Sequence, residues 1–161
     1  MTLKGLLLGC VLLLGSGLVM AQKVAKVKVT ELEKMIAESK TPLIINFWAT
    51  YCKPCIAEMP YFEKFAAKYK EKGVTVVFVS LDMQDDYPVK VDGFVAKRKL
   101  QNRVLWLDET DADYFCPKID PRWSGSIPAT LFVNNAKSYR QFLEKELTEE
   151  ELEKEIMAIL K

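Results

Sequence analysis

The sequence predicts an α/β fold in which helices flank a central mixed β-sheet. Apolar runs of strand length alternate along the chain with segments of helical periodicity, a pattern typical of a sheet whose strands are joined by helices. The last two apolar runs are separated only by a short turn at 134–137, which predicts an antiparallel hairpin. This closing hairpin is the feature that would make the sheet mixed.

Residues 1–21 have the pattern of a secretory signal peptide. A single basic residue, Lys4, precedes a leucine-rich run, and the tripeptide V-M-A suits cleavage after Ala21. The run is interrupted by glycines and is short for a membrane span, so an uncleaved anchor is a less favoured alternative, and a lipoprotein modified at Cys10 is less favoured still. We therefore expect an exported, periplasmic protein in which residues 22–161 form one domain.

The domain is expected to begin with a strand, a helix and a second strand. Residues 23–29 alternate polar and apolar side chains, as an edge strand does. Residues 30–40 show helical periodicity behind a capping box formed by Thr30 and Glu33. Residues 41–50 form a continuous apolar run, which is typical of a central strand buried on both faces.

The middle of the domain repeats this alternation. Apolar residues recur every three or four positions over 53–70, and Pro60 inside this helix predicts a kink. Residues 74–82 are expected to form a second central strand, Pro88 to begin a third helix, and residues 103–108 to form a short strand. The apolar face of the third helix is expected to comprise Val89, Phe94, Val95 and Leu100.

The last part of the domain is less regular. Residues 109–126 are expected to form a loop with a short helix near Tyr114, and the two strands of the hairpin follow it. A second capping box, formed by Thr148 and Glu151, predicts the start of the closing helix. One domain with no linker and no internal repeat accounts for the whole of this pattern.

The composition excludes several classes of function. The chain has no histidine, which removes the commonest metal ligand, the commonest general base and every Ser–His or Cys–His mechanism. Lys4 is the only charged residue before position 22, so the mature chain carries 23 − 1 = 22 basic and 22 acidic residues. With no basic excess we expect no nucleic-acid binding, and we expect no metal or other cofactor.

Two cysteines, Cys52 and Cys55, stand where an expected strand meets an expected helix. A structural disulfide rarely closes so short a loop, a zinc site would need more cysteines or histidines, and haem attachment would need a histidine after the second cysteine. A reactive dithiol is the favoured interpretation, and an inert clasp is the alternative. The helix N-terminus, aided by Lys53, would stabilise a thiolate at Cys52 and lower its pKa.

The stretch NFWATYCKPCIAEMP, residues 46–60, resembles the active-site region of the thioredoxin superfamily, specifically that of the exported TlpA/ResA-like thiol–disulfide oxidoreductases. The pattern in that family is N-F-W-A-x-W-C-x-P-C-x-x-E-x-P. A second stretch, GSIPATLFV at 125–133, matches the strand that carries the family's cis-proline. The resemblance implies a thioredoxin-like fold over residues 22–161 and thiol–disulfide exchange as the activity.

The resemblance also implies roles for individual residues. Cys52 would be the attacking cysteine and Cys55 the resolving one, and together they would form the redox-active disulfide. Pro128 would be the cis-proline that faces them, and the backbone of Ile127 would pair with an incoming peptide. Glu58 would assist proton transfer at Cys55, since no histidine can do so, and a solvated helix residue is the alternative.

Other residues near these motifs depart from the family pattern or have a less defined role. Trp48, beneath the active-site loop, and Tyr51, which replaces the family's tryptophan, are expected to border the substrate site. Asn46 replaces the buried aspartate of cytoplasmic thioredoxins. Trp123 is expected to pack in the core rather than at a groove, and Cys116 to be a buried thiol rather than a third redox cysteine.

Taken together, these residues predict an exported thiol–disulfide oxidoreductase, and the resemblance favours a reductant. The alternatives are a disulfide oxidase or isomerase, and a non-catalytic module that binds peptides. The expected partners are protein thiols and disulfides and a membrane electron donor, and the protein is expected to be a monomer.

Overall fold

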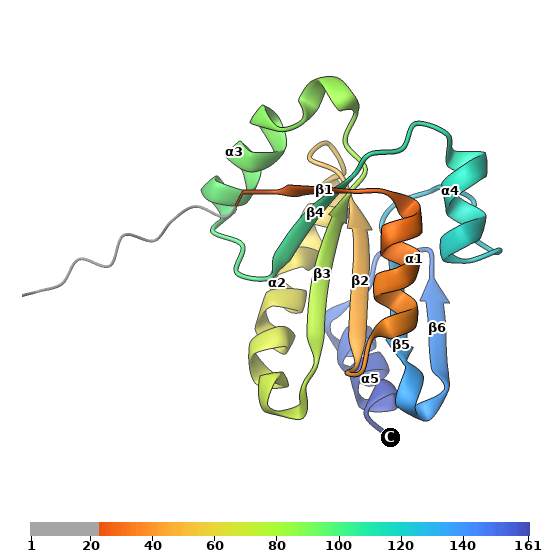
Figure 1. The fold of residues 1–161 in the computed structure, drawn as a ribbon. Helices are drawn as coiled ribbons and strands as arrows, with labels where there is room; N and C mark the ends of the chain where they lie inside the picture. The colour runs from red at the N-terminus through yellow and green to blue at the C-terminus, as the bar shows by residue number, and fades with distance from the viewer. Residues whose placement is uncertain (1–22) are drawn as a thin grey trace, which may run out of the picture.

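The computed structural model describes residues 23–161 as a six-stranded mixed sheet with helices on both faces (Figure 1). This confirms the predicted α/β class. The strands are β1 (Ala25–Val27), β2 (Leu43–Trp48), β3 (Thr75–Ser80), β4 (Arg103–Leu107), β5 (Ala129–Asn134) and β6 (Tyr139–Leu143). The helices are α1 (Val29–Glu38), α2 (Lys53–Lys68), α3 (Val89–Arg98), α4 (Ala112–Ile119) and α5 (Glu149–Ile159).

The strand order β1-β4-β3-β2-β5-β6 places the active-site segments at one edge of the sheet. Strands β1 to β4 run parallel to one another, whereas β5 pairs antiparallel with β2 and with β6. The carboxyl ends of β2, β3 and β4 therefore meet at the same edge, and β5 begins there. In β2, Trp48 lies opposite Ser80 of β3, and Asn46 lies opposite Thr130 of β5.

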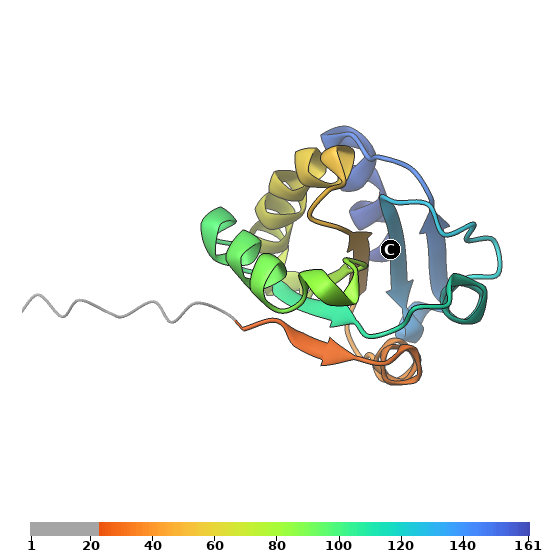
Figure 2. The same ribbon diagram turned by 90° about the horizontal axis from the view of Figure 1, so that it is seen from above.

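Helices α2, α3 and α5 cover one face of the sheet, and α1 and α4 cover the other, as the view from above shows (Figure 2). All six residues of β2 are buried, and they alternate between the two faces. Ile44 and Trp48 join the core under α2 and α5, while Ile45 and Phe47 join the core under α1. Asn46 shares the face of Ile44 and Trp48, so its amide points toward α2.

The starts of two helices differ from the prediction. α1 begins at Val29 with Lys28 as its N-cap, and the Glu31 carboxylate accepts the Lys28 backbone N–H at 2.8 Å. The predicted Thr30–Glu33 capping box is therefore wrong, because Thr30 already lies inside the first turn. The capping box at the start of α5 is confirmed, with reciprocal hydrogen bonds of 3.2 Å and 2.9 Å between Thr148 and Glu151.

The apolar face predicted for α3 is partly wrong. Val89 is 83% exposed, because it is the first residue of the helix and points into solvent. Val91 and Val95 are the buried residues of α3, and their spacing of four places them on one helical face. Pro60 does lie inside α2, and the kink that it predicts stays a prediction.

The predicted signal peptide, residues 1–21, lies outside the described residues. Over the range 23–161, none of the helices combines the length and the apolar character that crossing a membrane requires.

Candidate active site

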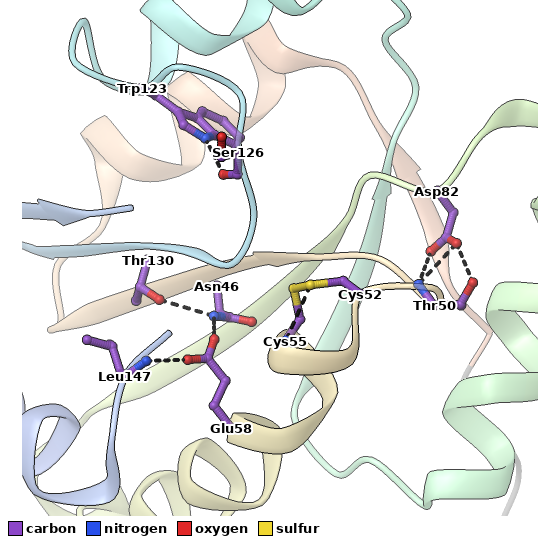
Figure 3. The surroundings of a disulfide bond; sticks show 10 residues. All are labelled: Asn46, Thr50, Cys52, Cys55, Glu58, Asp82, Trp123, Ser126, Thr130 and Leu147. Atoms are coloured by element: carbon purple, nitrogen blue, oxygen red, sulfur yellow. Dashed lines mark hydrogen bonds between the residues drawn. A yellow bond between two sulfur atoms is a disulfide. The ribbon is translucent and has the colours of Figure 1, made fainter. Parts of the chain in front are cut away.

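Cys52 and Cys55 form a disulfide at the start of α2 (Figure 3). Cys52 is the N-cap of the helix, and its sulfur accepts the backbone N–H of Cys55 at 3.3 Å. Its own N–H donates to the Ala49 carbonyl at 3.0 Å, which closes a turn between β2 and α2. Cys52 is 7% exposed and Cys55 is fully buried, so Cys52 is the more exposed of the two cysteines.

The position of Cys52 favours an anion on its sulfur once the disulfide is reduced. The first N–H groups of a helix have no partner within the helix, and the helix dipole adds partial positive charge at the same end. The Cys55 N–H already points at the Cys52 sulfur. A thiolate at this place is stabilised by that donor and by the dipole.

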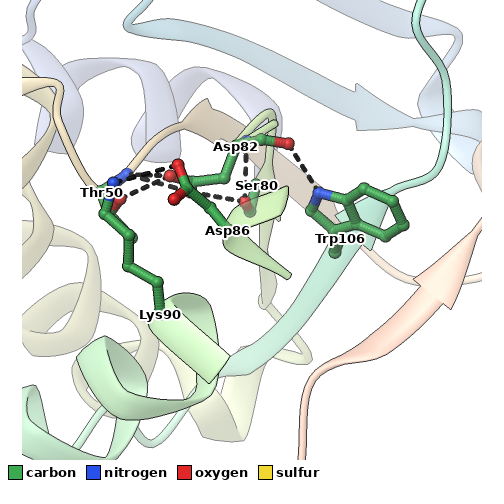
Figure 4. Close-up of polar contacts among 6 residues, drawn as sticks. All are labelled: Thr50, Ser80, Asp82, Asp86, Lys90 and Trp106. Carbon is green, nitrogen blue, oxygen red and sulfur yellow. Dashed lines mark hydrogen bonds and ion pairs between the residues drawn. The ribbon is translucent and has the colours of Figure 1, made fainter. Parts of the chain in front are cut away.

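A buried aspartate that the sequence analysis missed fixes the turn before Cys52 (Figure 4). Asp82, 4% exposed, follows β3, and its carboxylate accepts the Thr50 N–H at 3.0 and 3.1 Å and the Ser80 hydroxyl at 2.8 Å. The Thr50 hydroxyl donates to it as well. The signal that could have found it is an acidic residue directly at the carboxyl end of a parallel strand, beside the cysteine loop.

Glu58 is fully buried one helical turn after Cys55, so the alternative of a solvated helix residue is wrong. Its carboxylate accepts the Asn46 side-chain N–H at 2.8 Å and the Leu147 backbone N–H at 2.7 Å. Burial raises its pKa from 4.5 to about 7, although both hydrogen bonds favour the charged form. A carboxyl group with that pKa can both release and accept a proton at neutral pH.

Asn46 connects Glu58 to the strand of the cis-proline. Its side-chain nitrogen donates to Glu58 and, at 3.1 Å, to the Thr130 hydroxyl on β5. Its side-chain oxygen is buried and has no hydrogen-bond partner among the described residues. Asn46 stands at the position of the buried aspartate of cytoplasmic thioredoxins, and its amide orients the Glu58 carboxylate.

The Ile127–Pro128 peptide bond is cis, as predicted, and Pro128 is buried at the start of β5. The loop before it is held by Glu144, whose carboxylate accepts the N–H groups of Ser124 and Ser126. Ser126 also accepts the Trp123 indole N–H at 2.9 Å through its backbone carbonyl. These hydrogen bonds hold the loop that leads into Ile127, and the pairing of Ile127 with a substrate peptide stays a prediction.

Trp123 lies in an aromatic cluster beneath this loop. Its ring is 4.5 Å from Phe47, 5.7 Å from Phe115 and 5.8 Å from Phe142, measured between centroids. The prediction that Trp123 packs in the core is confirmed, since only 5% of the residue is exposed.

The two aromatic residues predicted to border the substrate site differ in exposure. Trp48 is fully buried, with its ring centroid 4.9 Å from that of Phe94, which agrees with its predicted place beneath the active-site loop; its role at the substrate site stays a prediction. The alternation of β2 turns it into the core. Tyr51, beyond the end of the strand, is 58% exposed beside Cys52 and is available for contact.

Cys116 is buried on α4, under the loop that precedes the cis-proline. Burial raises the pKa of its thiol to about 11, so it is protonated at neutral pH. A methyl group built on Gly125 would lie 3.7 Å from the Cys116 sulfur, which shows how closely the loop covers it. The predicted buried thiol is confirmed, and a protonated, covered thiol is unsuited to exchange.

Comparisons with known proteins agree with this geometry. The Redoxin family model matches residues 22–115. The chain is 37% identical over 111 residues to a thiol–disulfide oxidoreductase ResA of Oceanobacillus iheyensis, covering 69% of this chain and 53% of that protein. It is 31% identical over 135 residues to a ResA of Bacillus thuringiensis, covering 81% of this chain and 73% of that protein.

The chain belongs to the Redoxin family, as a ResA-like thiol–disulfide oxidoreductase of the thioredoxin superfamily. Its fold matches the crystal structure of a thioredoxin-related protein from Neisseria meningitidis, with a TM-score of 0.63 and 24% identity. That match covers 75% of this chain and 86% of the other.

Proposed function

We propose that the protein is an exported disulfide reductant that acts as a monomer on protein substrates. The observation that carries this proposal is the placement of Cys52, the more exposed sulfur of the disulfide, at the N-cap of α2. The reductant direction rests on the resemblance to the TlpA/ResA-like proteins, and export rests on the pattern of residues 1–21.

The proposed reaction begins with the reduced protein. The Cys52 thiolate attacks one sulfur of a substrate disulfide, forms a mixed disulfide and releases the other substrate sulfur as a thiolate. Glu58 then takes the proton of Cys55, and the Cys55 thiolate attacks the Cys52 sulfur. The second substrate sulfur leaves as a thiolate, and the substrate becomes a dithiol, two electrons richer, when its thiolates take up one proton from Glu58 and one from water. The Cys52–Cys55 disulfide remains. A membrane electron donor would reduce that disulfide again.

Activity is tested by reduction of insulin with dithiothreitol as the electron source. The wild-type protein is expected to accelerate precipitation of the reduced insulin chains, and Cys52→Ser is expected to match the uncatalysed rate. A wild-type protein no faster than Cys52→Ser would contradict the exchange activity and favour the non-catalytic binding module.

The direction of electron flow is tested by the equilibrium reduction potential in glutathione or dithiothreitol buffers. A value near about −270 mV, that of thioredoxin, supports a reductant. A value near about −120 mV, that of a strong oxidase, would contradict it and favour the oxidase alternative. Export is tested separately, by cell fractionation and by sequencing the mature N-terminus, which is expected to be Gln22.

A further inference from the structure

A cavity of about 440 Å³ opens beside the disulfide, on the side of the cis-proline. Tyr51, the residue before Cys52, and Ile127, the residue before the cis-proline, both line it. The remaining walls come from the segments that follow β3 and β4 and from the start of α4. A polypeptide bound at Cys52 and paired with Ile127 would therefore place a neighbouring side chain at this cavity.

The inner surface of the cavity is apolar. Trp106 and Phe115 belong to it, and 3% and 8% of these residues are exposed. The Trp106 indole N–H donates to the backbone carbonyl of Asp82 at 2.7 Å (Figure 4). The Trp106 ring stacks on Tyr87, with 4.3 Å between the ring centroids. Tyr51 and Met83 add exposed apolar surface at the rim. This surface suits the aliphatic part of a long side chain.

The charged side chains that line the cavity are all acidic, while two lysines, Lys26 and Lys28, lie next to one of them, Asp108. Four carboxylates line it, and none of the described residues that line it is lysine or arginine. Asp82 is satisfied by Thr50 and Ser80, Asp108 lies 3.3 Å from Lys28, and Glu109 accepts the Val29 N–H. Asp85 and Glu109 take part in no ion pair over residues 23–161. Asp85 is the exposed one of the two and its side chain makes no hydrogen bond in that range, so its carboxylate is the most available to a ligand.

We propose that this cavity binds a lysine or arginine side chain of the substrate polypeptide, within a few residues of the cysteine that is attacked. The aliphatic stem of the side chain packs on the apolar surface, and its cationic end lies in the field of the carboxylates, with Asp85 as the specificity-determining residue. This inference rests on the proposed exchange activity and names the class of substrate within it.

The test uses three matched peptides that differ only beside a single cysteine, with lysine, glutamine or glutamate at that position. Each cysteine carries thionitrobenzoate in a disulfide, and its release reports attack by the reduced protein. Rates are divided by those with dithiothreitol, which corrects for the intrinsic reactivity of each peptide. At low salt the wild-type protein is expected to prefer the lysine peptide over the glutamate peptide by about fivefold. The preference is expected to shrink at high salt.

Two neighbouring carboxylates give a matched pair of variants. Asp85→Asn is expected to lose most of the preference. Asp86→Asn removes the same charge one residue away, but Asp86 pairs with Lys90 at 3.0 Å and does not line the cavity, so this variant is expected to keep the preference.

Several outcomes would overturn the inference. Equal corrected rates with all three peptides would overturn it and leave the exchange activity intact. An equal loss of the lysine preference in Asp85→Asn and Asp86→Asn would also overturn it, because that result would indicate general charge steering. A dimer in sedimentation experiments, with Tyr51 shielded from solvent in that dimer, would also overturn the inference. In that case a second copy of the chain would cover the cavity. Attack on no peptide, matching Cys52→Ser, would contradict the proposed function itself.

Discussion

Asp82 and Glu58 are two buried carboxylates that lie on opposite sides of the disulfide (Figure 3). Asp82 receives hydrogen bonds from the backbone N–H of Thr50 and from the hydroxyls of Thr50 and Ser80. Glu58 receives two hydrogen bonds, one from the Asn46 side chain and one from the Leu147 backbone. Burial still raises the pKa of Glu58 to about 7.

The difference teaches that burial alone does not assign a carboxylate its role. Asp82 lies at the carboxyl end of β3 and holds the turn that ends in Cys52, so its hydrogen bonds fix backbone geometry. Glu58 lies one turn after Cys55 on the same helix, where its protonation can change while the helix stays in place. We propose that one carboxylate positions the cysteine that attacks and that the other moves the proton of the cysteine that resolves.

The largest expected effect follows from removing the Asp82 carboxylate. Asp82→Ala leaves the Thr50 N–H and the Ser80 hydroxyl without their acceptor in a buried place, and it is expected to lower the free energy of unfolding by about 3 kcal/mol. Urea unfolding of the oxidised protein measures this. Asp85→Ala, an exposed carboxylate three residues on, is expected to change it by less than about 0.5 kcal/mol. An equal loss of unfolding free energy in Asp82→Ala and Asp85→Ala would contradict the positioning role of Asp82.

The next effect concerns Glu58 and the pH dependence of stability. Its pKa is higher in the folded protein, about 7, than the ordinary value of 4.5, so the folded state holds the proton more tightly. Because of Glu58, the free energy of unfolding is therefore expected to fall by about 2 to 3 kcal/mol as pH rises from 4.5 to about 7. Glu58→Gln is expected to lose this slope in urea titrations at a series of pH values.

The glutamine variant has a suitable set of hydrogen-bond partners. The side-chain oxygen of a glutamine at position 58 can accept the Leu147 N–H. Once the Asn46 amide rotates, the glutamine nitrogen can donate to the Asn46 side-chain oxygen, which has no partner among the described residues. Glu150→Gln, at an exposed position on α5, is the control and is expected to keep the slope. A Glu58→Gln protein with the same slope as wild type would show that Glu58 does not titrate in this range.

A smaller effect is expected on the resolution step. Glu58→Gln cannot take a proton from Cys55, so conversion of a mixed disulfide on Cys52 to the intramolecular disulfide is expected to slow by about tenfold or more at pH 7. The initial attack by Cys52 is expected to be unaffected. Acid-quenched samples analysed by mass spectrometry separate the two steps, and equal slowing of both would indicate a general distortion of the site instead.

The smallest effect is expected at Lys53. The Lys53 side chain is exposed beside Cys52, where solvent and salt screen its charge. Lys53→Gln is expected to change the rate at which Cys52 attacks a neutral peptide disulfide by less than about twofold. Stopped-flow measurement at two salt concentrations checks this, and a tenfold loss would assign Lys53 a larger share in activating the thiol than the helix N-terminus.

The fold and the central residues of the site could be predicted because they carry local signals. Cys52 and Cys55 follow an apolar strand and precede a helix, and Pro128 stands in a recognisable motif far downstream. Asp82 was missed because its partner Thr50 lies 32 residues earlier in the chain, and only the pairing of β2 with β3 brings the two together.

Val89 was placed wrongly for a local reason. Val89 lies at the first position of α3, where the helical periodicity is not yet established and one residue of offset changes the exposed face.

The most direct test of the account is to trap the mixed disulfide. Reduced wild-type, Cys52→Ser and Cys55→Ser proteins are mixed with a disulfide-bonded peptide, alkylated and mapped by mass spectrometry. The account predicts a stable peptide adduct on Cys52 in Cys55→Ser, none in Cys52→Ser, and only the intramolecular disulfide in wild type. An adduct on Cys55 in Cys52→Ser, formed as fast as the one on Cys52, or no adduct in either variant, would contradict it.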